Sequence, residues 1–385
     1  MPVFDGYPAL PGVSDSFRGF TNLAAASGLV DPRTRKPLSE AMVLGISGGL
    51  GCGYILWEFK AYQSAILTLG FSYRWNYGKE VLLQTAERIG MVPGVHETGG
   101  KKSAANKLAE LAGQGIPALA FVDPYFMPHR GVPDHREGCG GVRIVICGRE
   151  GDDWLVQDGG IFRVSDQALV DARARVGSYK HFLMWFPAAG EPFDLRDAVL
   201  AGIHDHLTYL KAPSTSFGIP ALVKWAKLMT GTKDKKSWRT VFRDGNGLYS
   251  ALTSLYSGVE GETGGALRGL YADFLTEAAE TEPALASAAA RYREAQTCWR
   301  RLAEHAVAAL PETGRAVDQR FAALAAADHD ALAEANRVVE DLRRRFDPDF
   351  REPAGLFEQL QQDLQAVVAA EITARDHLSH IIETL

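Results

Sequence analysis

The chain has few cysteines, little imbalance of charge and no long apolar run. Its 385 residues include 4 cysteines, which form no CxxC pair, so neither a disulfide framework nor a structural zinc site is expected. The formal net charge of −6 argues against binding to nucleic acid. No apolar run reaches the roughly 18 residues that a membrane-spanning helix needs, so we expect no membrane partner.

The first residues, Met1 to Tyr7, also lack the basic stretch and apolar core of a secretory signal. Together with the unpaired cysteines, this predicts a protein of the reducing cytoplasm. We expect no cofactor and no metal. His204 and His206 lie two residues apart and so face different sides of a helix, and no carboxylate set accompanies His377 and His380.

The composition changes near residue 190. Before this point, helical periodicity alternates with continuous apolar runs; after it, the chain is alanine-rich with apolar residues at three- and four-residue spacing. The pattern predicts an α+β domain over 1–190 and an all-α helical domain over 191–385. In the first, helices are expected over 17–27, 39–44, 79–89 and 103–114, and strands over 117–122, 142–147, 154–157 and 181–186. In the second, helices are expected over 195–210, 219–229, 247–256, 264–280, 283–308, 316–346 with a break, and 353–384.

Glycine is concentrated between Gly45 and Gly53, directly after the expected helix 39–44. Glycine tolerates positive φ and lets the backbone approach another group closely, so we expect a loop that shapes a binding site. Gly49, Gly51 and Tyr54 are the candidate substrate-binding residues. The segment lacks the GK[ST] ending of a P-loop, which argues against a phosphate cradle.

Several segments, taken in their order and spacing, resemble the butirosin biosynthesis protein H family. They are 22–23, 38–54, 78–79, 116–125, 154–159, 258–271, 274–279 and Trp299, and the resemblance covers roughly residues 14–310. In that family, a papain-like, cysteine-protease-type N-terminal domain precedes a helical domain of uncharacterised type. The resemblance implies acyl transfer from a carrier-protein thioester to an amine in natural-product assembly.

A papain-like site needs a thiol at the start of the first helix, a histidine at the start of a central strand, and a carboxylate or amide on the next strand. Here the helix start reads Ser14-Asp15-Ser16-Phe17, and the strand start reads Gly140-Gly141-Val142. The carboxylate on the next strand is present as Asp158. The resemblance therefore implies a degenerate triad.

Two cysteines are candidate replacements for the missing thiol. Cys52 lies in the glycine-rich segment, where it is either a nucleophile or a small buried hydrophobe. Cys139 precedes the strand that lacks the histidine and is a candidate for lining the substrate site. Cys147 and Cys298 fall on an apolar strand and a helix face and are expected in the core.

Other residues offer alternatives for the nucleophile and the base. Ser16 is either a nucleophile or, like Ser14 and Asp15, a helix N-cap. His135 is the preferred base and His129 the second, both in the loop 127–136 that also follows the candidate substrate-binding residue Tyr125; the alternative is that these histidines are merely solvated.

Two residues of the helical half, Glu260 and Thr263, are further candidates for substrate binding. They precede Gly264-Gly265 and an expected helix, whose N-terminus could bind an anion. The alternative is a capping turn with Thr263 as the N-cap.

The preferred hypothesis is a biosynthetic acyltransferase or cyclase with an altered catalytic site. Its expected partner is an acyl- or peptidyl-carrier protein or a small-molecule thioester. The alternative is a catalytically inactive member that binds a carrier protein, an intermediate or a homologous enzyme. The last two expected helices suit either the exterior of a bundle or the contact of a homodimer.

Overall fold

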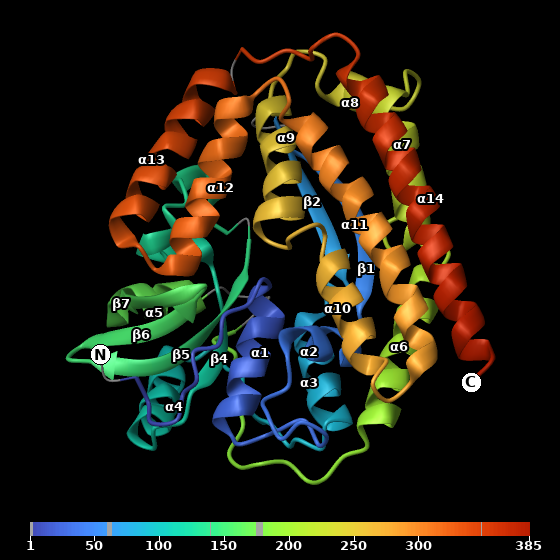
Figure 1. Ribbon diagram of the computed structural model, residues 1–385. Coiled ribbons are helices and arrows are strands. Elements are labelled where there is room, and N and C mark those ends of the chain that lie inside the picture. Colours follow the sequence, from blue (N-terminus) through green and yellow to red (C-terminus); the bar gives the residue numbers. More distant parts are fainter. Residues whose placement is uncertain (1–2, 60–63, 139, 175–179, 348) are drawn as a thin grey trace. The chain divides into compact units, whose positions relative to one another are not determined.

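A computed structural model describes residues 3–59, 64–138, 140–174, 180–347 and 349–385 (Figure 1). Contacts divide the chain into two compact units. The first comprises Met1–Val43, Leu82–Leu195 and Gln319–Arg337; the second comprises Leu44–Val81, Arg196–Asp318 and Val338–Leu385. The units do not follow the boundary expected at residue 190, because the chain enters each of them more than once. The class is α+β, as the sequence predicts.

The first unit contains an antiparallel sheet with the strand order β3-β8-β4-β5-β6-β7. The four expected strands are confirmed, with somewhat different ends. The strands are β3 (Gly94–His96), β4 (Ala118–Val122), β5 (Val142–Glu150), β6 (Asp153–Asp158), β7 (Gly160–Val164) and β8 (Leu183–Trp185). Strands β3 and β7 were not predicted, because the three residues of β3 show no period and β7 begins with Gly160, directly after the turn glycine Gly159.

Helix α1 (Asp15–Ala26) packs on β4 and β5 through an apolar face that includes Phe17 and Phe20. Helices α4 (Lys101–Gly113) and α5 (Asp166–Arg173) also belong to this unit. Helix α5 was not predicted, since its eight residues are too few to show a clear helical period. The side chain of Ser165 caps it by accepting the Ala168 N–H at 3.3 Å.

The second unit surrounds a two-stranded antiparallel hairpin with helices. Figure 1 shows β1 (Leu50–Phe59) beside β2 (Ser64–Ser72), and these strands contact α7 and α9 respectively. The prediction of a loop at 50–53 was therefore wrong, because the strand begins inside the glycine-rich segment. A Cβ at Gly51 would lie 2.2 Å from the Ser72 carbonyl oxygen, so the pairing itself requires this glycine.

The helical prediction for the second half is confirmed in outline. Helices of the second unit are α7 (Ile219–Thr230), α8 (Trp238–Val241), α9 (Leu248–Tyr256), α10 (Arg268–Ala278), α11 (Ala286–Ala306) and α14 (Leu356–Glu383). Helices that pass from one contact unit to the other are α2 (Glu40–Ile46), α3 (Gly78–Arg88), α6 (Leu195–Lys211), α12 (Pro311–Ala326) and α13 (His329–Phe346). The expected break in 316–346 falls at Ala327, which has a φ of 51°.

Helix α10 begins later than expected because the four residues before it are left-handed. Their φ values are 56° at Gly264, 94° at Gly265, 58° at Ala266 and 63° at Leu267. Left-handed backbone costs a residue with a Cβ roughly 1–2 kcal/mol, so Ala266 and Leu267 are strained positions that the surrounding packing must hold.

None of the helices within the described ranges combines the length and the apolarity that crossing a membrane requires.

Close packing of backbone against backbone in the second unit leads to a prediction for Gly202 of α6. A Cβ there would lie 2.1 Å from the carbonyl oxygen of Gly45, and a backbone oxygen has little freedom to move away. We expect Gly202→Ala to lower the free energy of unfolding by about 1–3 kcal/mol, measured as a lower urea midpoint.

Gly113→Ala is the matched control for this substitution. Gly113 also lies in a helix, α4, but a Cβ there would meet nothing within 4 Å. The control should leave the midpoint unchanged or raise it slightly. Equal midpoints for the two variants would contradict the packing argument.

Candidate functional site

The glycine-rich segment is fastened inside the second unit by Arg268. This side chain is fully buried, and its guanidinium donates to the carbonyls of Gly51 (2.9 Å), Phe71 (3.2 Å) and Ala266 (2.7 Å). Its Nε also donates to Glu371 Oε1 at 2.6 Å. The two strands of the hairpin, the left-handed turn and α14 thus meet at one cation.

Cys52 belongs to this buried group. It is 0% exposed, and Arg268 donates to its Sγ at 3.1 Å. Burial, with the neighbouring Glu371 carboxylate, raises the pKa of the thiol to about 12 despite the opposing effect of Arg268. A thiol that is protonated at neutral pH and closed to solvent is a poor nucleophile, so the structure favours the interpretation of Cys52 as a small core residue.

The three candidate substrate-binding residues near Cys52 are also packed in the core. Gly49 has a φ of 65°, and a Cβ there would lie 2.5 Å from the ring of Tyr271. Tyr54 stacks on Trp225 with 5.0 Å between ring centroids, and its hydroxyl accepts the indole N–H of Trp238 at 3.0 Å. Packing contacts are therefore enough to account for the presence of Gly49, Gly51 and Tyr54 at these positions.

His206 is a core residue of the same unit. Its Nδ1 accepts the backbone N–H of Leu50 at 3.2 Å, and its Nε2 lies 2.6 Å from the Tyr292 hydroxyl. Burial lowers the pKa of His206 to about 3, so the ring is neutral. The part of the chain that the structure describes contains no group of three His, Cys, Asp or Glu side chains placed to hold a metal ion.

Glu260 and Thr263 lie in and after a π-helical turn, Ser257–Gly261. The interpretation of Thr263 as the N-cap of α10 was wrong. Its hydroxyl donates to the preceding carbonyls of Gly258 (2.7 Å) and Val259 (2.9 Å). Glu260 lies 3.4 Å from Arg300 Nε, and burial raises the pKa of its carboxyl. Both residues fix the turn that leads into the left-handed segment.

The remaining candidate residues belong to the first unit, where α1 begins beside β5. Of the three expected N-cap candidates, Ser14 occupies the N-cap position of α1, and its side chain makes no capping bond. Asp15 Oδ1 accepts the backbone N–H of Ser16 at 2.6 Å and its hydroxyl at 3.1 Å. The Ser16 hydroxyl therefore faces a carboxylate on its own helix turn, and no histidine contacts it among the described side chains.

Arg143 occupies the start of β5. Its backbone N–H donates to Asp15 Oδ2 at 2.9 Å, and its guanidinium lies 3.7 Å from the same oxygen and 5.1 Å from the centre of the Phe121 ring. Guanidinium stays protonated in proteins and cannot act as a base. An ion pair therefore stands where the resemblance implies a thiol and an imidazole.

Asp158, at the end of β6, is fully buried among cations. Its carboxylate accepts two bonds from Arg130, one of them from Nε at 2.6 Å, and lies 4.0 Å from Arg18. His129 Nε2 is 2.8 Å from Oδ2. Burial alone would raise the pKa of this carboxyl, but Arg130 and His129 hold it well below its usual range.

His129, the second choice for the base, is the histidine that meets Asp158. Its side chain is 4% exposed, and its ring stacks on Phe162 at 4.1 Å. Its Nδ1 is buried without a partner in the described structure. The His129 carbonyl accepts a bond from Asn336 at 3.1 Å, which holds the loop in place.

The preferred base, His135, lies in the short 3-10 turn Asp134–Arg136, and its side chain is outside the described residues, as is Cys139 altogether. Tyr125 is on the same loop, and its hydroxyl donates to Asp134 Oδ1 at 3.1 Å. The sequence interpretation missed Arg130 and Arg143. Arg130 follows the candidate base His129, and Arg143 follows the expected strand start at 140–142, so a cation beside each position was visible in the sequence.

The fold and this site define an α+β protein in which ion pairs join the start of α1 to β5 and the loop 127–136 to the end of β6. Residues 19–159 match the family described as butirosin biosynthesis protein H, N-terminal, and residues 167–342 match a domain of unknown function (DUF4872). The chain is thus a butirosin biosynthesis protein H-like protein with a second domain. Among curated proteins, no match to the chain was found.

The buried charge of Asp158 predicts a specific dependence of stability on pH. Asp158→Asn leaves Arg130 and Arg18 without their carboxylate, so we expect a loss of about 3–5 kcal/mol at neutral pH. Because the folded pKa lies below the ordinary value of 3.8, the stabilisation by the charge is complete above that value and is lost as pH falls through the folded pKa. Urea denaturation of both proteins should give a constant difference at pH 5–7 that narrows below about pH 4.

Asp15→Asn is the matched control, since its carboxylate is partly exposed and paired with a partly exposed arginine. It should cost less than about 1 kcal/mol at neutral pH. A difference for Asp158→Asn that widens on acidification, or that equals the control at pH 7, would contradict this account.

Proposed function

We propose that this chain takes part in natural-product biosynthesis by binding an acyl thioester, either carrier-bound or free, without forming a covalent acyl-enzyme. Membership of the butirosin biosynthesis protein H-like family supports the biosynthetic part of the proposal. Helix α1 packs on β5, and Asp158 ends the next strand, an order of elements that supports a papain-like interpretation of the first domain.

The observation that carries the proposal is the contact between Asp15 and Arg143. A covalent mechanism needs a nucleophile within hydrogen-bond reach of a base. The start of α1 and the start of β5 are joined instead by a carboxylate that accepts a backbone N–H at 2.9 Å. Cys52, a second candidate nucleophile, is buried in the second unit and its pKa is raised. Cys139, the third candidate, lies outside the described residues.

The proposed partner is an acyl- or peptidyl-carrier protein or a small-molecule thioester. The alternative partner is a homologous enzyme that supplies the catalytic thiol. Both follow from the family's acyl-transfer chemistry together with the loss of the nucleophile here.

Intact-protein mass spectrometry tests the absence of an acyl-enzyme. After incubation with acyl-pantetheine thioesters at neutral pH, we expect no stoichiometric mass increase, because the described residues show no candidate thiol or hydroxyl activated by a neighbouring base. Binding should appear in the same samples as a saturable rise in melting temperature.

Ser16→Ala, Cys52→Ala and Cys139→Ala serve as controls for the three candidate nucleophiles and should bind thioester as the unchanged protein does. An adduct that disappears in one of these variants would overturn the proposal and identify that residue as the nucleophile. No thermal response to any thioester would remove the binding function.

A second candidate function is transfer of the acyl group by general acid–base catalysis, favoured by the geometry of His129. Its Nε2 is fixed at Asp158, and its Nδ1 has no partner among the described residues, as in a base that is oriented by a carboxylate. In such a reaction, the amine nitrogen bonds to the thioester carbonyl carbon and the carbon–sulfur bond breaks. His129 would take the proton from the amine and return it to the leaving thiolate.

Release of free thiol measures this second function directly. With an acyl-pantetheine and a primary amine, His129→Gln should lower the rate by about 100-fold or more if His129 is the base. His204→Gln, at an exposed position of α6, is the matched control and should retain the full rate. Thiol release at the same rate in both variants would exclude His129, and an absence of release above the uncatalysed rate would exclude the second function.

A further inference from the structure

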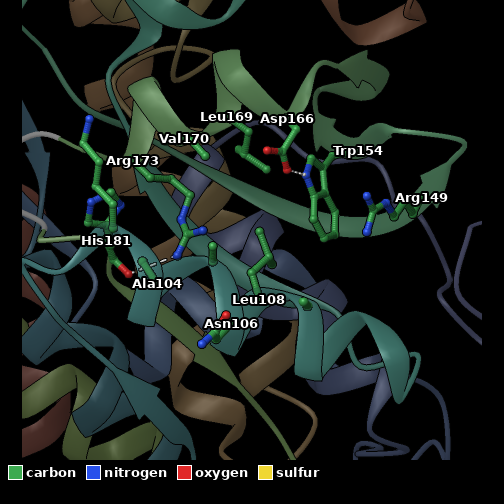
Figure 2. Close-up of a pocket in the computed structure, with 13 residues that line it drawn as sticks. Ala104, Asn106, Leu108, Arg149, Trp154, Asp166, Leu169, Val170, Arg173 and His181 are labelled. Carbon is green, nitrogen blue, oxygen red and sulfur yellow. Dashed lines mark hydrogen bonds between the residues drawn. The ribbon is translucent and has the colours of Figure 1, made fainter.

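A pocket of about 190 Å³ lies within the first unit, between α4 and α5 (Figure 2). One wall is the face of α4 that carries Ala104 and Leu108, and another is the face of α5 that carries Leu169 and Arg173. Trp154 and Arg149, from β6 and β5, close one side, and His181 closes another. None of these residues contributes to the group around Asp15 and Asp158.

The unusual feature of the pocket is a buried arginine without a carboxylate. Arg173 is 2% exposed, and its NH2 donates to the carbonyl of His181 at 3.2 Å. Its Nε has no partner, and no salt bridge joins it to any carboxylate in the described part of the chain. The nearest acidic influence is Asp166, which accepts the indole N–H of Trp154 at 2.9 Å.

Burying an unpaired charge costs several kcal/mol, and arginine does not escape this cost by losing its proton. Burial lowers the pKa of Arg173 only to about 10, so the guanidinium remains charged at neutral pH. The undescribed residues 175–179 that follow contain no Asp or Glu in their sequence. The pocket therefore holds an uncompensated positive charge.

The surroundings of Arg173 are also positive. Lys101 and Arg149 line the pocket, and only Asp166 among the lining residues is acidic. Burial lowers the pKa of His181, and Arg173 and Lys101 lower it further. The pKa of the nearby His96 is lowered in the same way by burial, Lys107 and Arg173. An anion in the pocket would meet attraction from at least three cations.

The rest of the lining is apolar, and it sets the size and nature of the ligand. Ala104, Leu108, Leu169, Val170 and Trp154 supply most of this surface. A cavity of about 150 Å³ holds one benzene molecule, so this pocket accepts a group of similar bulk. A guanidinium fork matches the two oxygens of a carboxylate.

From this combination we infer that the pocket between α4 and α5 binds a short-chain organic carboxylate, with its oxygens at Arg173 and its hydrocarbon body against the α4 face. The site is independent of the proposed thioester function, because it uses none of the residues that carry that proposal.

Butyrate is the probe for this site, and butyramide is its neutral counterpart of the same shape. With the full chain at constant ionic strength, butyrate should raise the melting temperature saturably and show transfer of saturation in ligand-observed NMR. Butyramide should do neither, since it lacks the charge. Equal responses to butyrate and butyramide would overturn the role of Arg173, and a response to inorganic phosphate but not butyrate would overturn the hydrocarbon part of the assignment.

Two adjacent lysines provide a matched pair of variants. Lys101 lines the pocket and Lys102 is exposed outside it. Lys101→Gln should weaken butyrate binding about threefold or more, as expected for an exposed charge near the ligand, while Lys102→Gln should leave it unchanged. Equal weakening by both would indicate attraction to a diffuse positive surface and would contradict the inference.

Arg173→Gln should weaken butyrate binding by at least about tenfold, the loss of a charge-assisted bidentate contact. Because Arg173 also holds the His181 carbonyl, Ala104→Leu provides a second variant that keeps every charge and reduces the free volume. It should abolish butyrate binding while the circular dichroism spectrum stays unchanged. Full butyrate binding by a folded Ala104→Leu protein would place the ligand elsewhere and overturn the assignment.

Discussion

The second unit depends on the burial of one guanidinium. Arg268 is fully enclosed, so each of its N–H groups must find an acceptor. Glu371 neutralises the charge, and the carbonyls of Gly51, Phe71 and Ala266 with the Sγ of Cys52 accept the remaining bonds. Those carbonyls can reach the cation only if the hairpin lies close and the chain before α10 turns left-handed. The glycines, the buried thiol and the strained turn are thus consequences of one requirement.

The first unit also depends on neutralising a buried charge, but here the charge is negative. Asp158 is an enclosed carboxylate, and Arg130, His129 and Arg18 surround it. Its neutralisation fixes the loop that carries His129 and leaves Asp15 and Arg143 to pair with each other at the start of α1 and β5. The charged side chains at these positions hold loops and strands of the first unit together. Chemistry in this unit therefore depends on whether the unpartnered Nδ1 of His129 meets a substrate.

The sequence predicted the elements whose signals are local. The helix periods of α6, α7 and α14 and the apolar runs of β4 and β5 lie within single windows, and those elements were found. Strand β1 was missed because its glycines are required by close contacts with Ser72 and Trp75. These residues lie about 20 positions further along the chain, outside the short segments in which a strand pattern is sought. The choice of His129 over His135 as the partner of Asp158, and the replacement of a thiol and an imidazole by Asp15 and Arg143, likewise depend on contacts between distant segments.

The bond between Arg268 and the carbonyl of Gly51 in the hairpin has a consequence for the synthesis of the protein. Gly51 and Arg268 are separated by 217 residues. At translation rates of 5–20 residues per second, Gly51 is synthesised about 10–40 seconds before Arg268. For most of that interval, α7 and α9, the helices that contact β1 and β2, have not been synthesised either, and exposed strand edges invite pairing with other chains. Production of this protein should therefore be more sensitive to chaperone supply and to growth temperature than its helical content suggests.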